Sequence, residues 1–210
     1  MHDTPRPHDL LWGMTPAQLP ADAPAWAIAV LAAGQPVVVR RARVALGEVA
    51  VGVRGASRDQ RYATSMALGH VLRCVSPEQL VQRLPTAGLP ALHALELVKP
   101  MLDALGYGWG VTGSVGYQLA TGLPTVTTGS DLDLLLRVPE PLSRDAAAEL
   151  LALFDGAPSR IDMQLETPNG AIALREWAGQ TARVLLKCAT GARLVADPWR
   201  LASDGTERVA

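Results

Sequence analysis

The chain has 210 residues, of which 49% are hydrophobic and 19% are charged, and its formal net charge is −1. Such a composition predicts a globular protein with one large domain or two small ones, and it excludes an intrinsically disordered chain. A net charge this close to zero provides no overall attraction to nucleic acid or to a membrane surface, so neither is an expected partner.

The sequence contains no segment typical of export or membrane insertion. Its longest apolar run, residues 25–33, is too short to span a bilayer. The first residues lack the charged and apolar regions of a signal peptide. The two cysteines, Cys74 and Cys188, do not have the spacing of a disulfide framework or a zinc site. We therefore expect a cytoplasmic protein.

Residues 1–84 predict a small mixed α/β domain. Asp22 is expected to cap a helix that has Pro24 in its first turn and ends at Gly34. Ser76, which is followed by proline and glutamate, predicts the start of a second helix.

Two strands are predicted between these helices. The β-branched run at residues 37–39 and the alternating residues 49–54 indicate strands, and a turn at residues 46–48 precedes the second of them. The stretch at residues 84–90 is rich in proline and glycine, so it predicts the linker to a second domain.

Residues 85–210 alternate between helical and strand patterns, which predicts a C-terminal α/β domain with a mixed sheet and an α+β class for the whole chain. The first helical segment is expected to break or kink at Pro100, before Leu105. The other predicted elements are strands at residues 109–112, 131–138, 160–165, 171–174 and 184–188, helices at 114–120 and 143–154, and a turn at 168–170.

The functional prediction centres on the strand that contains Ser130-Asp131-Leu132-Asp133-Leu134. Side chains alternate along a strand, so Asp131 and Asp133 share one face while the leucines enter a core. Two residues along a strand span roughly 6.6–6.8 Å, so both carboxylates can converge on a divalent cation. Mg²⁺ is commonly held by one or two carboxylates and substrate phosphates, so it is the expected cofactor.

An Asp-x-Asp pattern alone is also typical of an edge strand with a charged outer face. Two other features favour a catalytic site. Gly113-Ser114 lies between a predicted strand and a predicted helix, where exposed backbone N–H groups can hold a phosphate. Asp162 lies on the polar face of the strand at residues 160–165, and it completes a three-carboxylate site if that strand lies beside the Asp131 strand.

A competing motif occurs just before the proposed phosphate loop. Residues 108–113 match Gly-x-Gly-x-x-Gly, and Asp131 follows at nearly the distance of a ribose-binding acid. In a dinucleotide-binding fold the motif follows a strand and the acid ends the next strand. Here the preceding segment is helical and Asp131 begins a strand, so we reject this alternative.

The order of Gly-Ser, Asp-x-Asp and a later strand aspartate resembles the polymerase-β-type nucleotidyltransferase superfamily. Three longer stretches resemble the malonate decarboxylase holo-acyl-carrier-protein synthases, also called phosphoribosyl-dephospho-CoA transferases (the MdcG family), over nearly the whole chain. They are residues 6–12 (RPHDLLW), residues 51–55 (VGVRG) with Arg58 and Arg61, and residues 113–118 (GSVGYQ) with 130–137 (SDLDLLLR).

The resemblance implies an enzyme that attaches a prosthetic group. It would move phosphoribosyl-dephospho-CoA from triphosphoribosyl-dephospho-CoA to a serine of the acyl carrier protein subunit of malonate decarboxylase, with release of pyrophosphate. Asp131 and Asp133 would hold Mg²⁺, and Asp162 would be a third ligand or would activate the carrier hydroxyl. Ser114, with Gly113 and Ser130, would bind substrate phosphates.

The N-terminal segment is locally basic. An arginine-rich surface suits substrate phosphates or an acidic carrier protein, although a solvated face explains it equally simply. Lys187, on a predicted strand, can also meet a phosphate, whereas His8 is expected to be packed or exposed and not catalytic. We assign Arg54, Arg58 and Arg61 to substrate binding. Residues 40–73 contain only two acidic residues, Glu48 and Asp59, against seven arginines: Arg40, Arg41, Arg43, Arg54, Arg58, Arg61 and Arg73.

Two alternatives stay open. One is another minimal nucleotidyltransferase that consumes ATP without a carrier protein. The other is a catalytically inactive domain that binds a carrier or regulatory partner.

Overall fold

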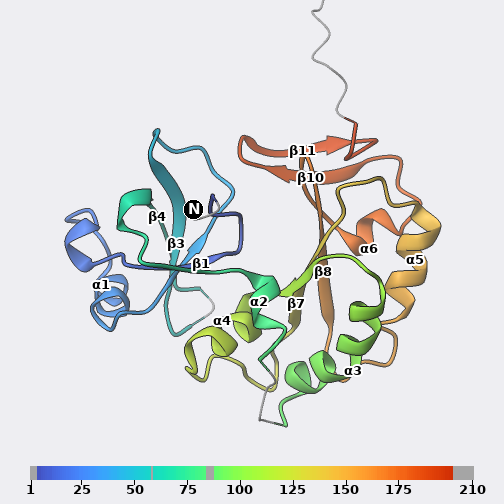
Figure 1. Cartoon of the computed structure of the whole chain (residues 1–210), viewed down its shortest axis with the longest axis horizontal. Coiled ribbons are helices and arrows are strands. Elements are labelled where there is room, and N and C mark those ends of the chain that lie inside the picture. The colour runs from blue at the N-terminus through green and yellow to red at the C-terminus, as the bar shows by residue number, and fades with distance from the viewer. Residues whose placement is uncertain (1–3, 58, 84–87, 201–210) are drawn as a thin grey trace, which may run out of the picture.

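The computed structural model describes residues 4–57, 59–83 and 88–200 and places them in two β-sheets with helices packed on each (Figure 1). The predicted α+β class is confirmed. The first sheet is antiparallel throughout, in the order β4 (Arg61–Ala67), β3 (Glu48–Arg54), β2 (Val37–Val39), β1 (Leu10–Trp12) and β5 (Arg73–Val75).

Helix α1 (Ala25–Ala32) packs on strand β3, whose alternating valines are buried. The prediction that Asp22 caps this helix is wrong, because Pro24 itself occupies the N-cap position with a φ of −59° and the cap makes no side-chain hydrogen bond. Gly34 follows the helix with a φ of +67°, as a C-terminal glycine does. Two short 3₁₀ helices complete this part, η1 (Pro16–Gln18) and η2 (Leu68–His70).

The second sheet has the order β11 (Gly191–Val195), β10 (Val184–Cys188), β9 (Gly170–Ala173), β8 (Ile161–Thr167), β7 (Leu132–Arg137) and β6 (Trp109–Val111). Strands β7 and β8 are parallel and the other neighbouring pairs are antiparallel, so the sheet is mixed as predicted. Its helices are α2 (Pro77–Leu80), α3 (Pro90–Ala104), α4 (Gly113–Thr121), α5 (Arg144–Ala152) and α6 (Leu174–Trp177).

Helix α3 is continuous through Pro100, so the predicted break there is wrong. Pro100 is exposed, whereas Leu92, Leu95, Val98 and Leu102 are buried on the opposite side. We attribute the continuity to this packing, which outweighs the loss of one backbone hydrogen bond.

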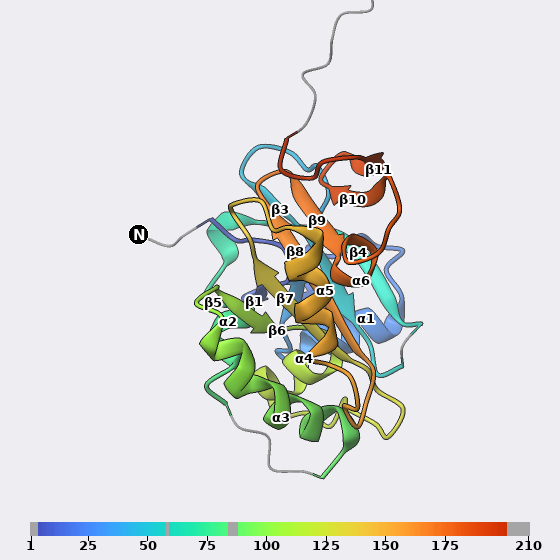
Figure 2. The same ribbon diagram turned by 90° about the vertical axis from the view of Figure 1, so that its right-hand side faces the viewer.

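Strand β8 has one apolar and one polar face, and β7 continues both except for the buried Leu135 between Asp133 and Arg137. Leu132, Leu134 and Leu136 are at most 1% exposed, and they belong to a core with α3, α5 and α6. The view turned by 90° shows α3 and α5 in front of this sheet (Figure 2). The opposite face carries Asp133 beside Asp162 in the parallel register, and it lies toward the first sheet.

Several contacts join the two sheets. The Tyr117 hydroxyl of α4 donates to Gln35 Oε1 at 3.1 Å, just before β2. Helix α2 follows β5 and packs on β6 and α4. Residues 84–87 of the predicted linker lie outside the described residues, so the boundary at residue 84 stays a prediction.

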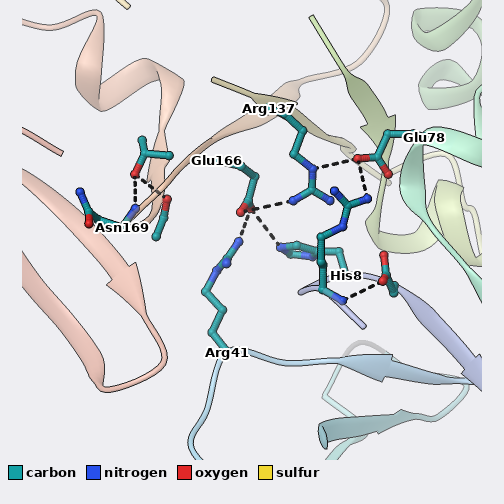
Figure 3. A network of polar contacts seen from close by, with 10 residues as sticks. His8, Arg41, Glu78, Arg137, Glu166 and Asn169 are labelled. Atoms are coloured by element: carbon teal, nitrogen blue, oxygen red, sulfur yellow. Dashed lines mark hydrogen bonds and ion pairs between the residues drawn. The ribbon is translucent and has the colours of Figure 1, made fainter. Parts of the chain in front are cut away.

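Glu166 of β8 is the centre of a further connection between the sheets (Figure 3). Its buried carboxylate accepts a hydrogen bond from Arg41, which follows β2, and lies 3.7 Å from Arg137 Nη1. Arg137 in turn donates to Glu78 Oε1 of α2 at 2.8 Å, and Glu78 pairs with Arg6 at 3.6 Å. Nowhere in the described chain is a helix long and apolar enough to cross a membrane.

Candidate active site

Gly113 brings the start of helix α4 against strand β7. The Thr112 N–H donates to the Asp133 backbone carbonyl at 2.9 Å. The next residue, Gly113, has a φ of +62°, and a Cβ built on it would overlap the Asp133 carboxylate. Both the backbone conformation and the close approach therefore require glycine at this position.

The loop between α4 and β7 is fastened to the helix. Gln118 Oε1 accepts hydrogen bonds from the N–H groups of Thr125 and Val126, both at 2.9 Å. The Thr125 hydroxyl donates to the Ser114 carbonyl at 2.9 Å. Further along, Ser130 Oγ accepts from the Thr127 N–H at 2.9 Å. These bonds hold the end of the loop, and with it Asp131, beside the start of α4.

The result is a cavity of about 320 Å³ between the loop, α4, β7 and the first sheet. It brings together seven of the nine residues that the sequence assigns to the site, whereas Arg58 lies outside the described residues. The seven are Arg54, Arg61, Gly113, Ser114, Ser130, Asp131 and Asp133.

Asp162 lies next to Asp133 across the parallel strands, which meets the condition stated from the sequence, but it is not among the described residues that line this cavity. Its Oδ1 atom accepts two hydrogen bonds from Arg160, at 2.8 and 3.0 Å. The pKa of Arg160 is raised by these bonds and by the charge of Asp162, and further by the charges of Asp131 and Asp133. Arg160 thus offsets repulsion among the three carboxylates, and the role assigned to Asp162 stays a prediction.

Arg54 and Arg61 are directly opposite each other on β3 and β4. Like charges in such a pair repel, and an anion between them would remove that cost. Arg54 is half-buried, its guanidinium carbon lies 5.4 Å from the centre of the Tyr117 ring, and its buried Nε has no hydrogen-bond partner in the described chain. Burial first, and then the charge of Arg61, lowers the pKa of Arg54. The pair is therefore suited to bind an anion.

A second cavity of about 480 Å³ adjoins the first between the two sheets. The two cavities share four lining residues, and the second cavity has a more apolar wall. The shared residues are Arg54, Arg61, Gly113 and Asp133. That wall includes Leu10, Tyr62, Leu80, Val111 and Tyr117.

Two family models match the chain in succession. The model described as the phosphoribosyl-dephospho-CoA transferase MdcG N-terminal domain matches residues 6–77, and that of the MdcG C-terminal domain matches residues 79–198. A Pseudomonas fluorescens Pf-5 protein named phosphoribosyl-dephospho-CoA transferase is 63% identical over 193 residues, which are 92% of this chain and 93% of that protein. Proteins of the same name from Pseudomonas putida W619 and Azotobacter vinelandii DJ are 62% and 57% identical. These two alignments cover 94% and 95% of this chain and 96% and 98% of the relatives.

The chain belongs to the phosphoribosyl-dephospho-CoA transferase family. The family resemblance stated from the sequence is thereby confirmed, as is the prediction that the protein is a transferase. No solved structure matches the chain, so the likeness of the second sheet to polymerase-β-type enzymes stays a prediction.

The donor atoms that line the first cavity suit Mg²⁺. Asp131 and Asp133 line the same cavity, and Gly113 leaves the Asp133 carboxylate room at the start of α4. The described residues contain no group of three or more His, Cys, Asp or Glu side chains placed to hold a metal. The protein therefore offers two carboxylates, and substrate phosphates would have to supply further ligands, as is usual for Mg²⁺.

Sequence reasoning missed three residues that shape the site. Gln118 fixes the loop, Tyr117 supports Arg54, and Arg160 pairs with Asp162. For Gln118 and Tyr117 the only sequence signal was their position in the stretch at residues 113–118 that resembles the family. Arg160 directly precedes the strand that carries Asp162, but nothing in the sequence indicates that its side chain turns back onto that carboxylate.

Proposed function

We propose that this enzyme transfers phosphoribosyl-dephospho-CoA from 2′-(5″-triphosphoribosyl)-3′-dephospho-CoA to a serine of the apo acyl carrier protein subunit of malonate decarboxylase. The serine oxygen would bond to the α-phosphorus, the bond from that phosphorus to the bridging oxygen would break, and pyrophosphate would leave with both electrons of that bond. The observation that carries the proposal is a single cavity lined by two carboxylates, two arginines and the start of a helix.

The positively and negatively charged residues of the cavity have different roles. Arg54 and Arg61 bind the triphosphate end and offset the negative charge that develops on the leaving pyrophosphate. The backbone N–H groups at Gly113 and Ser114 orient the same phosphates at the helix start. Phosphoryl transfer needs mainly positioning and charge neutralisation, and this arrangement provides both.

Asp131 and Asp133 would hold Mg²⁺. The ion would neutralise phosphate charge and orient the phosphate oxygens. The serine proton must pass to a base as the new bond forms, and Asp162 is the described carboxylate next to Asp133 that can receive it.

The test is the mass of the purified apo carrier subunit before and after incubation with enzyme, donor and Mg²⁺. We expect one phosphoribosyl-dephospho-CoA group per carrier and one pyrophosphate released. Asp131→Asn and Asp133→Asn should each slow transfer by about 100-fold or more, because each removes charge stabilisation worth several kcal/mol. Substantial activity in both folded variants would contradict the catalytic assignment.

Two controls separate the proposal from its alternatives. A carrier with alanine in place of the acceptor serine should stop pyrophosphate release, and rapid donor hydrolysis with that carrier would indicate a hydrolase. ATP should be a poor donor because it lacks the pantetheine arm, whose binding energy cannot then assist the reaction. Efficient AMP transfer would favour the minimal nucleotidyltransferase, and tight partner binding without any turnover would favour the inactive domain.

A further inference from the structure

A third cavity, of about 460 Å³, lies beyond the second one and has a basic lining. Arg40 and Arg41 directly follow strand β2 of the first sheet, and Lys187 lies on strand β10 of the second. No aspartate or glutamate is among the described residues that line it. Neither the proposed transfer chemistry nor the sequence-based site uses this cavity.

The three cavities follow one another in a row. The first and second share Arg54, Arg61, Gly113 and Asp133, whereas the second and third share a different set that includes His8, Arg40 and Gln164. The described residues that line the first cavity include none that line the third. A ligand that follows this row therefore passes a cavity with two arginines and two aspartates, a second cavity with more apolar walls, and a third cavity with a basic lining.

Two of the three cations in the third cavity are available to a ligand. Arg41 is bound to Glu166, so its charge is already matched. Arg40 and Lys187 make no ion pair with any described residue, and both side chains are exposed. The Arg40 side chain crosses β3 at Gly52, where a Cβ would stand 3.1 Å from Arg40 Cδ. Lys187 and His8 line the same cavity.

The donor proposed above has a matching order of chemical groups. Its triphosphate is attached through a ribose to adenosine, and the adenosine is attached through its 5′-diphosphate to the pantetheine arm. Two anionic groups are thus separated by a nucleoside. In the protein, the arginine pair of the first cavity and the basic lining of the third are likewise separated by a cavity with more apolar walls.

We propose that the third cavity is a second anion subsite, in which Arg40 and Lys187 bind the 5′-diphosphate of the dephospho-CoA portion. This inference rests on the proposed function, because it requires a dephospho-CoA donor. The nucleoside would occupy the second cavity beside Tyr62, and the pantetheine arm would leave the third cavity past β10.

The test measures binding without turnover, with dephospho-CoA and adenosine as separate probes in titration calorimetry. Lys187→Ala should weaken dephospho-CoA binding by about tenfold, the value of one hydrogen bond between charged groups, and leave adenosine binding unchanged. Arg40→Gln should give the same selective loss. Arg193→Ala is the matched control, because Arg193 lies on the adjoining strand β11, pairs with Leu186 and so points to the other face of the hairpin.

Selective weakening in both variants, with the control unchanged, supports the subsite. Equal affinity of all variants for dephospho-CoA, equal losses for dephospho-CoA and adenosine, or no dephospho-CoA binding by the unaltered enzyme would each overturn it. The carrier assay tests the proposed function independently. If transfer succeeds but Lys187→Ala binds dephospho-CoA normally, only the subsite is wrong. If Lys187→Ala binds it selectively more weakly but no group reaches the carrier, only the proposed reaction is wrong.

Discussion

Gly113 combines a positive φ with close contact to the Asp133 carboxylate. We expect Gly113→Ala to slow transfer by about 100-fold, because the added methyl group displaces the Asp133 carboxylate or the helix start by about 1 Å. The positive φ should also cost about 1–3 kcal/mol of stability. Gly122→Ala is a matched control, since Gly122 ends the same helix with a φ of +76° and has nothing within 4 Å of the added carbon. It should lose stability but keep its kcat, and an equal loss of kcat in both variants would show that strain alone is responsible.

His8 is a packed residue, as the sequence suggested, and its titration contributes to stability. Burial, followed by the charges of Arg41, Arg137 and Lys187, lowers its pKa from 6.5 to about 4. The unfolded chain therefore takes up this proton first as the pH falls, so the folded state loses stability between those two values. Between about pH 7 and about pH 5 the loss should be roughly 2 kcal/mol.

His8→Asn tests this assignment. Asparagine tolerates the positive φ of +76° at this position but does not titrate. The free energy of unfolding is measured by denaturant titration at about pH 7 and about pH 5. The difference between the two values should be smaller in the variant than in the unaltered protein by roughly 2 kcal/mol. An identical pH dependence in both proteins would show that other groups cause it.

At the scale of elements, the loop from α4 to β7 positions the carboxylates. Gln118→Ala leaves the Thr125 and Val126 N–H groups without their acceptor, so we expect a loss of about 1–2 kcal/mol in stability and a drop of about tenfold in kcat. Gln118→Glu keeps an acceptor oxygen at the same place and should restore most of both. Full activity in the alanine variant, measured with the carrier assay, would show that the loop holds its position without these bonds.

The sequence predicted best those elements that have strong periodicity or clear end signals. Strand β7 and helix α5 are where they were expected, and Ser143 caps α5 with a 3.1 Å bond from the Ala146 N–H. Strands β1 and β5 were missed because they have three residues each, as was the short helix α6. Strands β4 and β11 were missed because their side chains are mostly exposed or half-buried. Strand β1 pairs with β2 and β5, which lie far along the chain, so no local pattern marks β1 or β5.

For the site, the sequence predicted which types of residue occur and in which order. It did not predict how buried their side chains are or which residues they contact. Asp131 directly precedes β7, Asp133 lies in it, and both line the same cavity. The sequence could not show that Arg160 turns back onto Asp162, or that Arg54 and Arg61 face each other across two strands. Such pairings depend on sheet register and loop geometry, which long-range packing decides.

At the scale of the whole molecule, the row of three cavities keeps its shape only if both sheets are held together. Glu166 connects Arg41, beside the first sheet, with Arg137 of the second (Figure 3). Burial pushes the pKa of Glu78 upward, but the hydrogen bond and the charge of Arg137, together with hydrogen bonds from the backbone and from Ser76, outweigh it and the pKa is lowered. The Glu78 carboxylate therefore stays charged at neutral pH and continues the network toward Arg6. The described cations and carboxylates alternate along this path, and Glu166 is the member with the least exposed side chain.

Glu166→Gln should therefore loosen the connection between the sheets. The substitution keeps the shape of the side chain but leaves two largely buried guanidinium groups facing each other without its charge, at a cost of about 3–5 kcal/mol. Because the network joins two separate cores, we also expect denaturant unfolding to broaden or to split into two steps. The measurement is urea unfolding followed by tryptophan fluorescence and circular dichroism together, with Glu149→Gln, on the exposed side of α5, as a charge-matched control. A single sharp transition with the control's stability would mean that Tyr117 and α2 hold the two sheets together without Glu166.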